Sequence, residues 1–276
     1  CLCYADFLDT ERFYDSTKTD LRGGWPSLDS IRTRFTAHLI ALEGSAPETP
    51  VNSIRAEVRR ACVDGASQAP GFFTLTVPTG GGKTFAGMAF ALEHARRHGL
   101  ARVVVAIPFT SIIEQNADVY RRAMGDDAVL EHHSALDPAD PSRETPRTRI
   151  ASENWDGPIV VTTTVQLFES LLANRASRCR KLHRLARSVI VLDEAQTLPV
   201  GLLEPTLDVL NGLVRDYGTT VVFSTATQPA FRRRPGRSVG LDGLRELAPN
   251  PARLFERLKR VEVHWPADAT TATTWE

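Results

Sequence analysis

The sequence predicts an α/β fold in which a parallel β-sheet carries helices on both faces. From residue 71 on, short apolar and β-branched runs alternate with segments of helical periodicity, as in buried parallel sheets. A glycine-rich turn joins the first such run to the next helix, a combination typical of ligand-binding α/β proteins. Strands are expected at residues 73–77, 102–107, 128–131, 158–162, 188–192 and 219–224, and helices at 85–97, 111–124, 165–173 and 202–217.

The first 70 residues carry helical patterns and no strand pattern, so we expect a short all-α segment ahead of the sheet. Its expected order is helix 1–14, loop 15–24, a helix opened by Pro26 that ends at Gly44, linker 45–50 and helix 52–66. Within the α/β region, the charged and proline-rich stretch 138–146 is expected to be a loop.

Composition limits the classes of partner. Lys+Arg and Asp+Glu each number 33, so the 276-residue chain has no formal net charge and any nucleic-acid site must be local. No apolar run approaches the roughly 20 residues of a membrane helix, and the first residues lack a signal-peptide pattern. We therefore expect a cytoplasmic protein with no membrane partner. The four cysteines lack zinc-site spacing and are expected to be free thiols.

The glycine-rich turn is the main candidate for a phosphate-binding loop. Its consecutive glycines let backbone N–H groups point inward, with no Cβ in the way of a phosphate. Lys83 can reach the β- and γ-phosphates of a nucleotide, and the Thr84 hydroxyl can bind Mg²⁺. The usual pattern starts with glycine, whereas this one starts with Val77, so a turn without a ligand is the alternative for this motif alone. The expected ATP-binding residues are Pro78, Thr79, Gly80, Gly81, Gly82, Lys83 and Thr84.

A second candidate motif, Asp193-Glu194-Ala195-Gln196, directly follows an apolar strand. Asp193 would hold the Mg²⁺ that bridges the β- and γ-phosphates, and Glu194 would activate the attacking water. Alone, such an acidic pair is often structural, but together with the glycine loop about 110 residues earlier it indicates nucleotide hydrolysis.

A third motif, Ser224-Thr225-Ala226-Thr227, ends another apolar strand. Ser224 and Thr227 could hydrogen-bond to the loop of residues 193–196 and pass the nucleotide state to another site. A Ser/Thr-rich turn without such a role is the alternative.

In this order, the three motifs resemble motifs I, II and III of superfamily 2 helicases. The intervening stretches are similar to the helicase-nuclease of type I CRISPR systems, above all its subtype I-C form. These stretches cover residues 107–115, 130–134, 153–156, 161–171 and 193–199. The resemblance implies a RecA-like P-loop NTPase fold with ATP and Mg²⁺ as cofactors, acting in antiviral defence. It also implies movement along single-stranded DNA in the 3′-to-5′ direction, with a crRNA-guided surveillance complex as partner.

The resemblance assigns roles to individual residues. It makes Lys83, Glu194 and Gln196 catalytic, and Thr84, Asp193 and Glu194 ligands of Mg²⁺. Coupling between sites falls to Ser224, Thr225 and Thr227. The residues expected to contact DNA phosphates are Pro108, Thr110 and Ser111 of motif Ia and Thr163 and Thr164 of motif Ib. Thr110 or Ser111 would also serve as the N-cap of the helix that follows. Asn52 and Arg55 occupy the region where the family contacts adenine, although neither is the usual glutamine.

The family also has an HD nuclease domain, which precedes two RecA-like domains. Asp6 resembles its last metal ligand, but the other ligands are absent from this sequence, so a divalent transition metal is expected only in the intact nuclease domain. We expect a piece of a longer protein, with no nuclease activity of its own and little turnover. The expected division is nuclease tail 1–45, linker and nucleotide-site helix 46–70, first RecA-like domain 71–260, and 261–276 leading to a second RecA-like domain.

Alternatives stay open at this point. The three motifs alone also permit another superfamily 2 DNA or RNA helicase or translocase, or a non-catalytic nucleotide-binding module. His132 and His133 are expected to be core or loop histidines rather than metal ligands. The basic runs at 178–184 and 232–234 are either solvated surfaces or DNA contacts.

Overall fold

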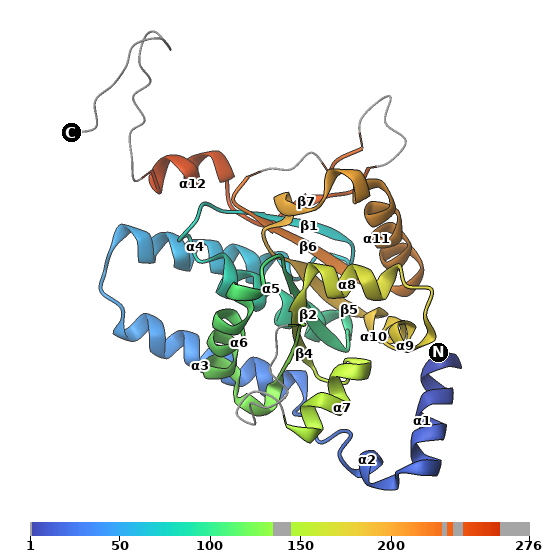
Figure 1. Cartoon of the computed structure of the whole chain (residues 1–276). Coiled ribbons are helices and arrows are strands. Elements are labelled where there is room, and N and C mark those ends of the chain that lie inside the picture. The colour runs from blue at the N-terminus through green and yellow to red at the C-terminus, as the bar shows by residue number, and fades with distance from the viewer. Residues whose placement is uncertain (1, 135–144, 228–230, 234–239, 260–276) are drawn as a thin grey trace, which may run out of the picture.

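The computed structural model describes residues 2–134, 145–227, 231–233 and 240–259, and it confirms the predicted α/β fold. Parallel strands form one seven-stranded sheet with the order β3-β4-β2-β5-β6-β1-β7, and helices cover both faces (Figure 1). The strands are β1 (Phe72–Thr76), β2 (Arg102–Ile107), β3 (Val129–His132), β4 (Ile159–Thr163), β5 (Ser188–Leu192), β6 (Thr220–Thr225) and β7 (Arg245–Glu246).

Helices precede the sheet and connect its strands. Within the described residues, no helix is long and apolar enough to span a bilayer. The α-helices are α1 (Leu2–Tyr14), α2 (Ser16–Asp20), α3 (Leu28–Ser45), α4 (Pro50–Gly65), α5 (Lys83–His98), α6 (Thr110–Met124), α7 (Pro146–Asn154), α8 (Thr164–Leu171), α9 (Ala176–Cys179), α10 (Leu182–Leu185), α11 (Leu203–Tyr217) and α12 (Pro251–Arg257). The 3₁₀ turns are η1 (Asp126–Ala128), η2 (Ala195–Thr197) and η3 (Val200–Leu202).

The sheet separates two hydrophobic cores. Successive side chains of a strand point to opposite faces, so β2 contributes Val103, Val105 and Ile107 to one core and Val104 and Ala106 to the other. The first core lies under α3, α4, α5 and α6, and the second lies under α7, α8, α10 and α11. Burial on both faces explains why the strands are continuously apolar rather than alternating.

Helix α5 is the central helix of the first core, and its N-terminus carries Lys83. It is buried without interruption from Ala86 to Ala95, and its alanines and Gly87 let it lie close to the sheet. The helix ends at Gly99, whose φ of 63° gives the left-handed C-cap that glycine adopts without strain. Tight packing of this helix therefore fixes the backbone position of Lys83.

The N-terminal helices begin at positions that differ slightly from the predicted ones. Pro26 does not open α3, because Ser27 caps that helix by accepting a hydrogen bond from the Ser30 amide. Pro50 was expected in a linker but forms the first turn of α4, where proline lacks only an N–H that would stay unpaired anyway. The expected loop 15–24 contains the short helix α2.

Several elements were not predicted. Helix α7 follows the expected proline-rich loop, most of which lies outside the described residues, and it starts with a capping box between Thr145 and Thr148. Helices α9 and α10 overlap the two ends of the basic run 178–184, and α12 follows the strand β7. The expected path of residues 261–276 also lies outside the described residues.

Strand β7 is short and depends on one carboxylate. Glu246 accepts hydrogen bonds from the hydroxyls of Thr74 (2.8 Å) and Thr76 (2.6 Å) and from the amides of Thr76 (3.0 Å) and Ala248 (2.9 Å). Two residues carry no periodicity, so such a strand cannot be found from the sequence pattern.

Acid should destabilise the fold through His94, which is buried in α5. Its ring accepts from the Thr220 hydroxyl (2.9 Å) and donates to the Ala66 carbonyl (3.0 Å), so the neutral form fits the site. Burial, and secondarily the nearby His98 and Arg245, lowers the pKa of His94 to about 4. The unfolded chain binds the additional proton near pH 6.5. The free energy of unfolding should therefore fall by up to about 1.4 kcal/mol per pH unit as pH drops from 6.5 towards 4.

Urea unfolding at pH 7 and pH 5 measures this effect, with His94→Gln as the matched variant. That variant should lose less stability than the parent between the two pH values. Burial also lowers the pKa of His132, to about 3, so part of the acid sensitivity should remain in the variant. Equal pH dependence of the parent and the variant would contradict the assignment to His94.

Candidate nucleotide and nucleic-acid site

The three predicted motifs meet at the carboxyl ends of β1, β5 and β6, which are neighbours in the sheet. Ligands of open parallel sheets bind at this edge. The Val77 amide donates to the Thr225 carbonyl (3.1 Å), and the Ser224 hydroxyl donates to Asp193 Oδ1 (2.8 Å). The end of β6 thus connects the glycine loop to the acidic motif.

The glycine loop has a backbone that other residues would strain. Gly80 and Gly82 have φ values of 84° and 88°, in the left-handed region. Gly82 is the N-cap of α5 and offers no side-chain acceptor to the first amides of that helix. Those amides and the positive end of the helix are therefore available to an anion such as a phosphate.

Replacing Gly81 by alanine should weaken nucleotide binding at least about tenfold, because an added Cβ would lie 2.4 Å from Val77 Cγ1 and 3.1 Å from the Pro78 carbonyl oxygen. The loop would have to shift to relieve this overlap. Gly212→Ala is the matched control, since its Cβ would meet nothing within 4 Å. Titration with a fluorescent ATP analogue compares the two variants, and unchanged affinity in Gly81→Ala would contradict the assigned loop geometry.

Lys83 and Glu194 face each other across the site. Lys83 Nζ is buried, makes no hydrogen bond to a described residue and lies 3.4 Å from Glu194 Oε1. Glu194 Oε2 accepts a hydrogen bond of 2.6 Å from Gln196 Nε2, and Gln196 Oε1 accepts one of 2.6 Å from the Thr225 hydroxyl. Lys83, Glu194, Gln196 and Thr225 thus form a continuous polar chain.

Glu194 also has an unusual backbone. Its φ of 46° and ψ of 49° place a non-glycine residue in the left-handed region, a conformation that costs on the order of 1–3 kcal/mol and is concentrated at functional sites. The turn aims the side chain back towards Lys83 instead of along the direction of β5. Nothing in the sequence pattern signals this conformation.

Asp193 is buried at the end of β5, and burial raises the pKa of its carboxyl group. The Ser224 hydroxyl and Lys83 oppose this shift, whereas Glu194 adds to it. A carboxylate without a directly bound cation, close to a phosphate-binding loop that carries the Thr84 hydroxyl, is a donor set that suits Mg²⁺. Mg²⁺ in such sites keeps water and phosphate oxygens as most of its ligands, so few protein oxygens are needed.

The third motif makes one of its two expected contacts with the acidic loop through a different residue. Ser224 makes the expected contact, whereas the expected contact of Thr227 with residues 193–196 is made by Thr225. Thr227 instead donates its amide to the Thr225 hydroxyl (3.0 Å), and its carbonyl oxygen lies close to the same hydroxyl, whose single proton is donated to Gln196. The reason is that the backbone turns directly after β6, so the backbone of Thr227 contacts the Thr225 side chain and the Thr227 side chain does not reach the acidic loop.

Four of the five expected DNA-contacting residues line a pocket of about 290 Å³ at the ends of β2, β3 and β4. Neither Thr110 nor Ser111 is the N-cap of α6, contrary to the alternative role. Phe109 holds that position in an extended conformation and provides no side-chain cap. The N-cap residue of this 15-residue helix therefore provides no side-chain acceptor for the first amides.

Motif Ib differs from motif Ia. Thr163 caps α8 by accepting from the Gln166 amide (2.9 Å), which leaves its hydroxyl proton free to be donated. The Thr164 hydroxyl donates to the Ile107 carbonyl (3.3 Å), so in this conformation it has no proton to offer to a phosphate. Pro108, Thr110, Ser111 and Thr163 all line the pocket, and Thr164 does not.

A further pocket of about 410 Å³ adjoins the glycine loop between α3 and α4. Asn52, Arg55, Gly82 and Phe85 are among its lining residues. Arg55 Nε donates to the Gly80 carbonyl (2.9 Å), and its Nη1 donates to Asn52 Oδ1 (3.1 Å). The Arg55 side chain therefore links this pocket directly to the loop.

Most of the basic run at 178–184 packs against the protein, including the N-terminal helix α1, whereas Arg178 at its start is exposed. Arg180 and Lys181 are buried, and the Arg180 guanidinium lies over the Phe7 ring at 4.4 Å. Arg184 donates to the Tyr4 hydroxyl (3.0 Å) and to Asp156 (2.5 Å). Of the second basic run, Arg233 is paired with Asp242, and Arg234 lies outside the described residues.

The histidines of the 130–134 stretch have protein partners. Trp155 Nε1 donates to His132 Nδ1 (3.1 Å), and His133 Nε2 lies 2.9 Å from Glu131 Oε1. Asp6 is exposed on α1, and among the described residues no three His, Cys, Asp or Glu side chains form a metal-binding group. Its role as a nuclease ligand stays a prediction.

A family model described as DEAD/DEAH box helicase matches residues 57–234, which include all three motifs. The chain belongs to the DEAD/DEAH box helicase family. The family assignment supports the RecA-like interpretation of the sheet.

A comparison of sequences makes the resemblance more specific. The chain is 35% identical over 216 residues to the CRISPR-associated nuclease/helicase Cas3 of Haloferax volcanii, covering 67% of this chain and 23% of that protein. This relationship confirms the resemblance to the CRISPR helicase-nuclease. The chain thus spans less than a quarter of the length of this relative.

Solved structures support the fold. The T. fusca Cas3-ATP structure matches with a TM-score of 0.54 and 23% identity, covering 71% of this chain and 22% of that one. The T. fusca Cas3-AMPPNP structure matches with a TM-score of 0.52 and 22% identity, covering 72% and 22%. At this identity, the matches establish a shared helicase architecture, and residue roles depend on the local geometry.

Proposed function

We propose that this chain is the ATP-binding RecA-like domain of an ATP-dependent DNA helicase of type I CRISPR interference. The observation that carries the proposal is the buried Lys83 ammonium, which lies beside Glu194 at the glycine loop and makes no hydrogen bond to a described residue. Glu194 neutralises part of this charge, but a buried ammonium group that makes no hydrogen bond still has unsatisfied donors, which the oxygens of a bound anion can fill. The phosphate oxygens of ATP can accept these hydrogen bonds, and one of the matched T. fusca structures is described as Cas3-ATP.

Lys83 would exchange partners when the nucleotide binds. Its ammonium would move from Glu194 to the β- and γ-phosphates, which releases Glu194 Oε1 to accept the proton of the attacking water. Gln196, bonded to the other oxygen of Glu194, keeps the carboxylate oriented. Thr84 and Asp193 would hold Mg²⁺, which supplies charge neutralisation at the phosphates.

The third motif would pass the state of the nucleotide to the DNA. Ser224 contacts Asp193, and Thr225 contacts Gln196, so a shift of the acidic loop displaces the end of β6. Thr227 supports Thr225 through its backbone. We assign coupling to these three residues.

Single-stranded DNA would lie across the pocket at the ends of β2, β3 and β4. The N-terminus of α6, whose N-cap Phe109 provides no side-chain acceptor, offers donors to phosphates together with Thr110, Ser111 and the Thr163 hydroxyl. Pro108 lines the same pocket, and Thr164 would contact the DNA through its backbone rather than its hydroxyl, which is bonded to Ile107. The pocket beside Arg55 and Asn52 would take the nucleoside of ATP.

The intact protein would move 3′-to-5′ on single-stranded DNA and would be recruited by a crRNA-guided surveillance complex in a prokaryotic cytoplasm. In the proposed division, residues 1–45 belong to a nuclease domain in which Asp6 is a metal ligand. Residues 46–70 then complete the nucleotide site, 71–260 form the first RecA-like domain and 261–276 lead to the second.

Streptavidin displacement tests this function. A protein that contains both RecA-like domains should, with ATP and Mg²⁺, remove streptavidin from the 5′ end of biotinylated single-stranded DNA and leave a 3′ block in place. A preference for the opposite end would contradict the direction, and displacement of RNA-bound streptavidin alone would favour an RNA translocase.

A further inference from the structure

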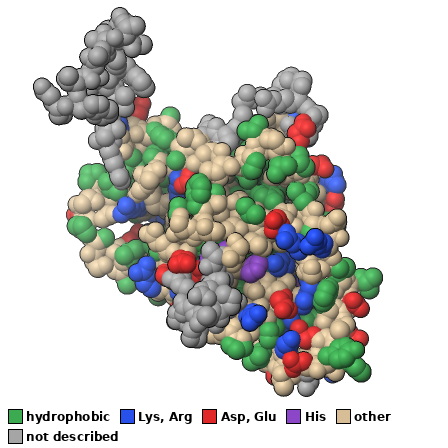
Figure 2. Space-filling view, viewed as in Figure 1, with side chains coloured by type: hydrophobic (Ala, Val, Ile, Leu, Met, Phe, Trp, Pro, Cys, Tyr) green, Lys and Arg blue, Asp and Glu red, His purple; other side chains and the backbone are tan. Residues whose placement is uncertain are grey.

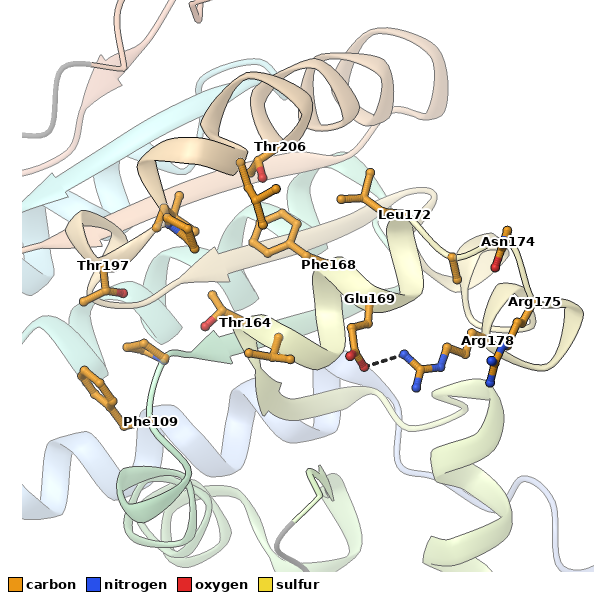
Figure 3. Close-up of a pocket in the computed structure, with 16 residues that line it drawn as sticks. Phe109, Thr164, Phe168, Glu169, Leu172, Asn174, Arg175, Arg178, Thr197 and Thr206 are labelled. Atoms are coloured by element: carbon orange, nitrogen blue, oxygen red, sulfur yellow. Dashed lines mark ion pairs between the residues drawn. The ribbon is translucent and has the colours of Figure 1, made fainter.

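A pocket at the ends of β2 and β4 is not explained by nucleotide or phosphate binding. It measures about 690 Å³ and lies between α8 and the segment of residues 197–206 (Figure 3). Its volume lies within the range of ligand-binding pockets. Hydrophobic side chains also gather on the face of the molecule over α8 and α11 (Figure 2).

Apolar side chains of this pocket are exposed to an unusual degree. Phe109 is 50% exposed, Val165 60%, Leu172 47% and Leu202 54%. Phe168 points into the space between them (Figure 3). A contiguous apolar surface of this kind indicates a binding site, because single exposed apolar residues are common but clusters are not.

The two ends of the pocket point to an anionic polymer. At one end, Pro108, Phe109 and Val165 also line the smaller pocket that holds Thr110, Ser111 and Thr163. At the other end lie Arg175 and Arg178, and Arg178 forms an ion pair with Glu169 (2.6 Å; Figure 3). Among the described residues, Arg175 forms no ion pair. Phosphate-binding groups therefore flank an apolar middle.

We propose that this pocket binds unstacked bases of single-stranded DNA, with Phe109 as the stacking side chain. The proposal rests on the proposed function, because it requires the phosphates of the same strand at the N-terminus of α6. Bases offer an apolar face and phosphates a charged edge, which matches the pocket and its ends. Bases inside a duplex are already stacked, so the pocket favours a single strand over a duplex.

The test compares two ligands of equal length, an oligothymidylate and an abasic oligonucleotide with the same number of phosphates. Fluorescence anisotropy with this 276-residue chain should show tighter binding to oligothymidylate. Phe109→Ala should weaken that binding roughly 5- to 150-fold and leave binding of the abasic strand almost unchanged. Phe109→Trp should retain the preference for the base-bearing strand.

Phe255→Ala is the matched control, because Phe255 is 41% exposed on α12 and is not a lining residue. It should leave both affinities unchanged. A second readout is 2-aminopurine placed in the oligonucleotide, whose fluorescence should change on binding to the parent and not to Phe109→Ala. Thermal unfolding shows whether each variant is folded.

The outcomes separate the two proposals. Equal binding of the two strands by the parent, with no effect of Phe109→Ala, would overturn base binding while phosphate binding stands. Binding of neither strand would overturn both. A third outcome is that the parent binds both strands equally and that Phe109→Ala loses association with the second RecA-like domain. This outcome would assign the pocket to a protein contact instead.

Discussion

The isolated chain should bind ATP but turn it over very slowly, on the order of 10⁻² per second or below. In superfamily 2, hydrolysis takes place in a cleft between two RecA-like domains, and the second domain directs arginines at the γ-phosphate. An arginine of this kind is worth on the order of 10³- to 10⁵-fold in nucleotide-hydrolysing enzymes. In the proposed division, Lys83, Asp193 and Glu194 all belong to the first domain. A steady-state ATPase assay with and without single-stranded DNA measures the rate.

A protein that also contains the second domain should recover DNA-stimulated turnover. Glu194→Gln in that protein should abolish hydrolysis and retain ATP binding, because the amide keeps the shape of the side chain but cannot accept the proton of water. Robust stimulated turnover by the isolated chain would contradict the requirement for a second domain. Substantial hydrolysis by Glu194→Gln would contradict the role of the base.

Replacing Trp155 by alanine should cause the largest loss of stability, about 3–5 kcal/mol, because it removes a fully buried indole from the second core. The change would also leave His132 Nδ1 without the donor that the indole provides. Trp155 ends α7 in the left-handed conformation, with φ of 57°, and its carbonyl accepts from Arg102. Several elements therefore meet at this side chain.

Urea unfolding measures this loss. Trp25→Ala is the control, because Trp25 is only partly buried and contacts Arg147 at 4.6 Å, so its removal should cost clearly less. Trp155→Phe should fall between the parent and Trp155→Ala. Equal stability of the Trp155→Ala and Trp25→Ala variants would contradict the central position of Trp155.

The sequence predicted the parts of this molecule that follow from short-range rules. Continuous apolar runs identified six of the seven strands, since burial on both faces leaves a clear pattern. The glycine loop and Asp193 were identifiable because few residue types fit their backbone or chemistry. Strand β7 was missed because Glu246 holds it through contacts that lie about 170 residues apart in the chain.

Side-chain partners at the site were harder to predict. Thr225, not Thr227, contacts the acidic motif, because the backbone turns directly after β6. The left-handed backbone of Glu194 has no sequence signature, yet it directs the carboxylate to Lys83. The basic run at 178–184 looked like surface, whereas the tertiary fold buries Arg180 under α1. Charge alone does not show whether a cation faces water, DNA or another helix.

The most direct test of the account is titration of this chain with a fluorescent ATP analogue and Mg²⁺, beside Lys83→Ala and the control Lys18→Ala. Lys83 is the buried cation at the glycine loop, whereas Lys18 is half-exposed on α2. We expect saturable binding by the parent and Lys18→Ala, and a loss of at least about 10-fold in Lys83→Ala, since a hydrogen bond to a charged group is worth roughly 1.5–3 kcal/mol. Binding of Lys83→Ala as tight as that of the parent would contradict the nucleotide site.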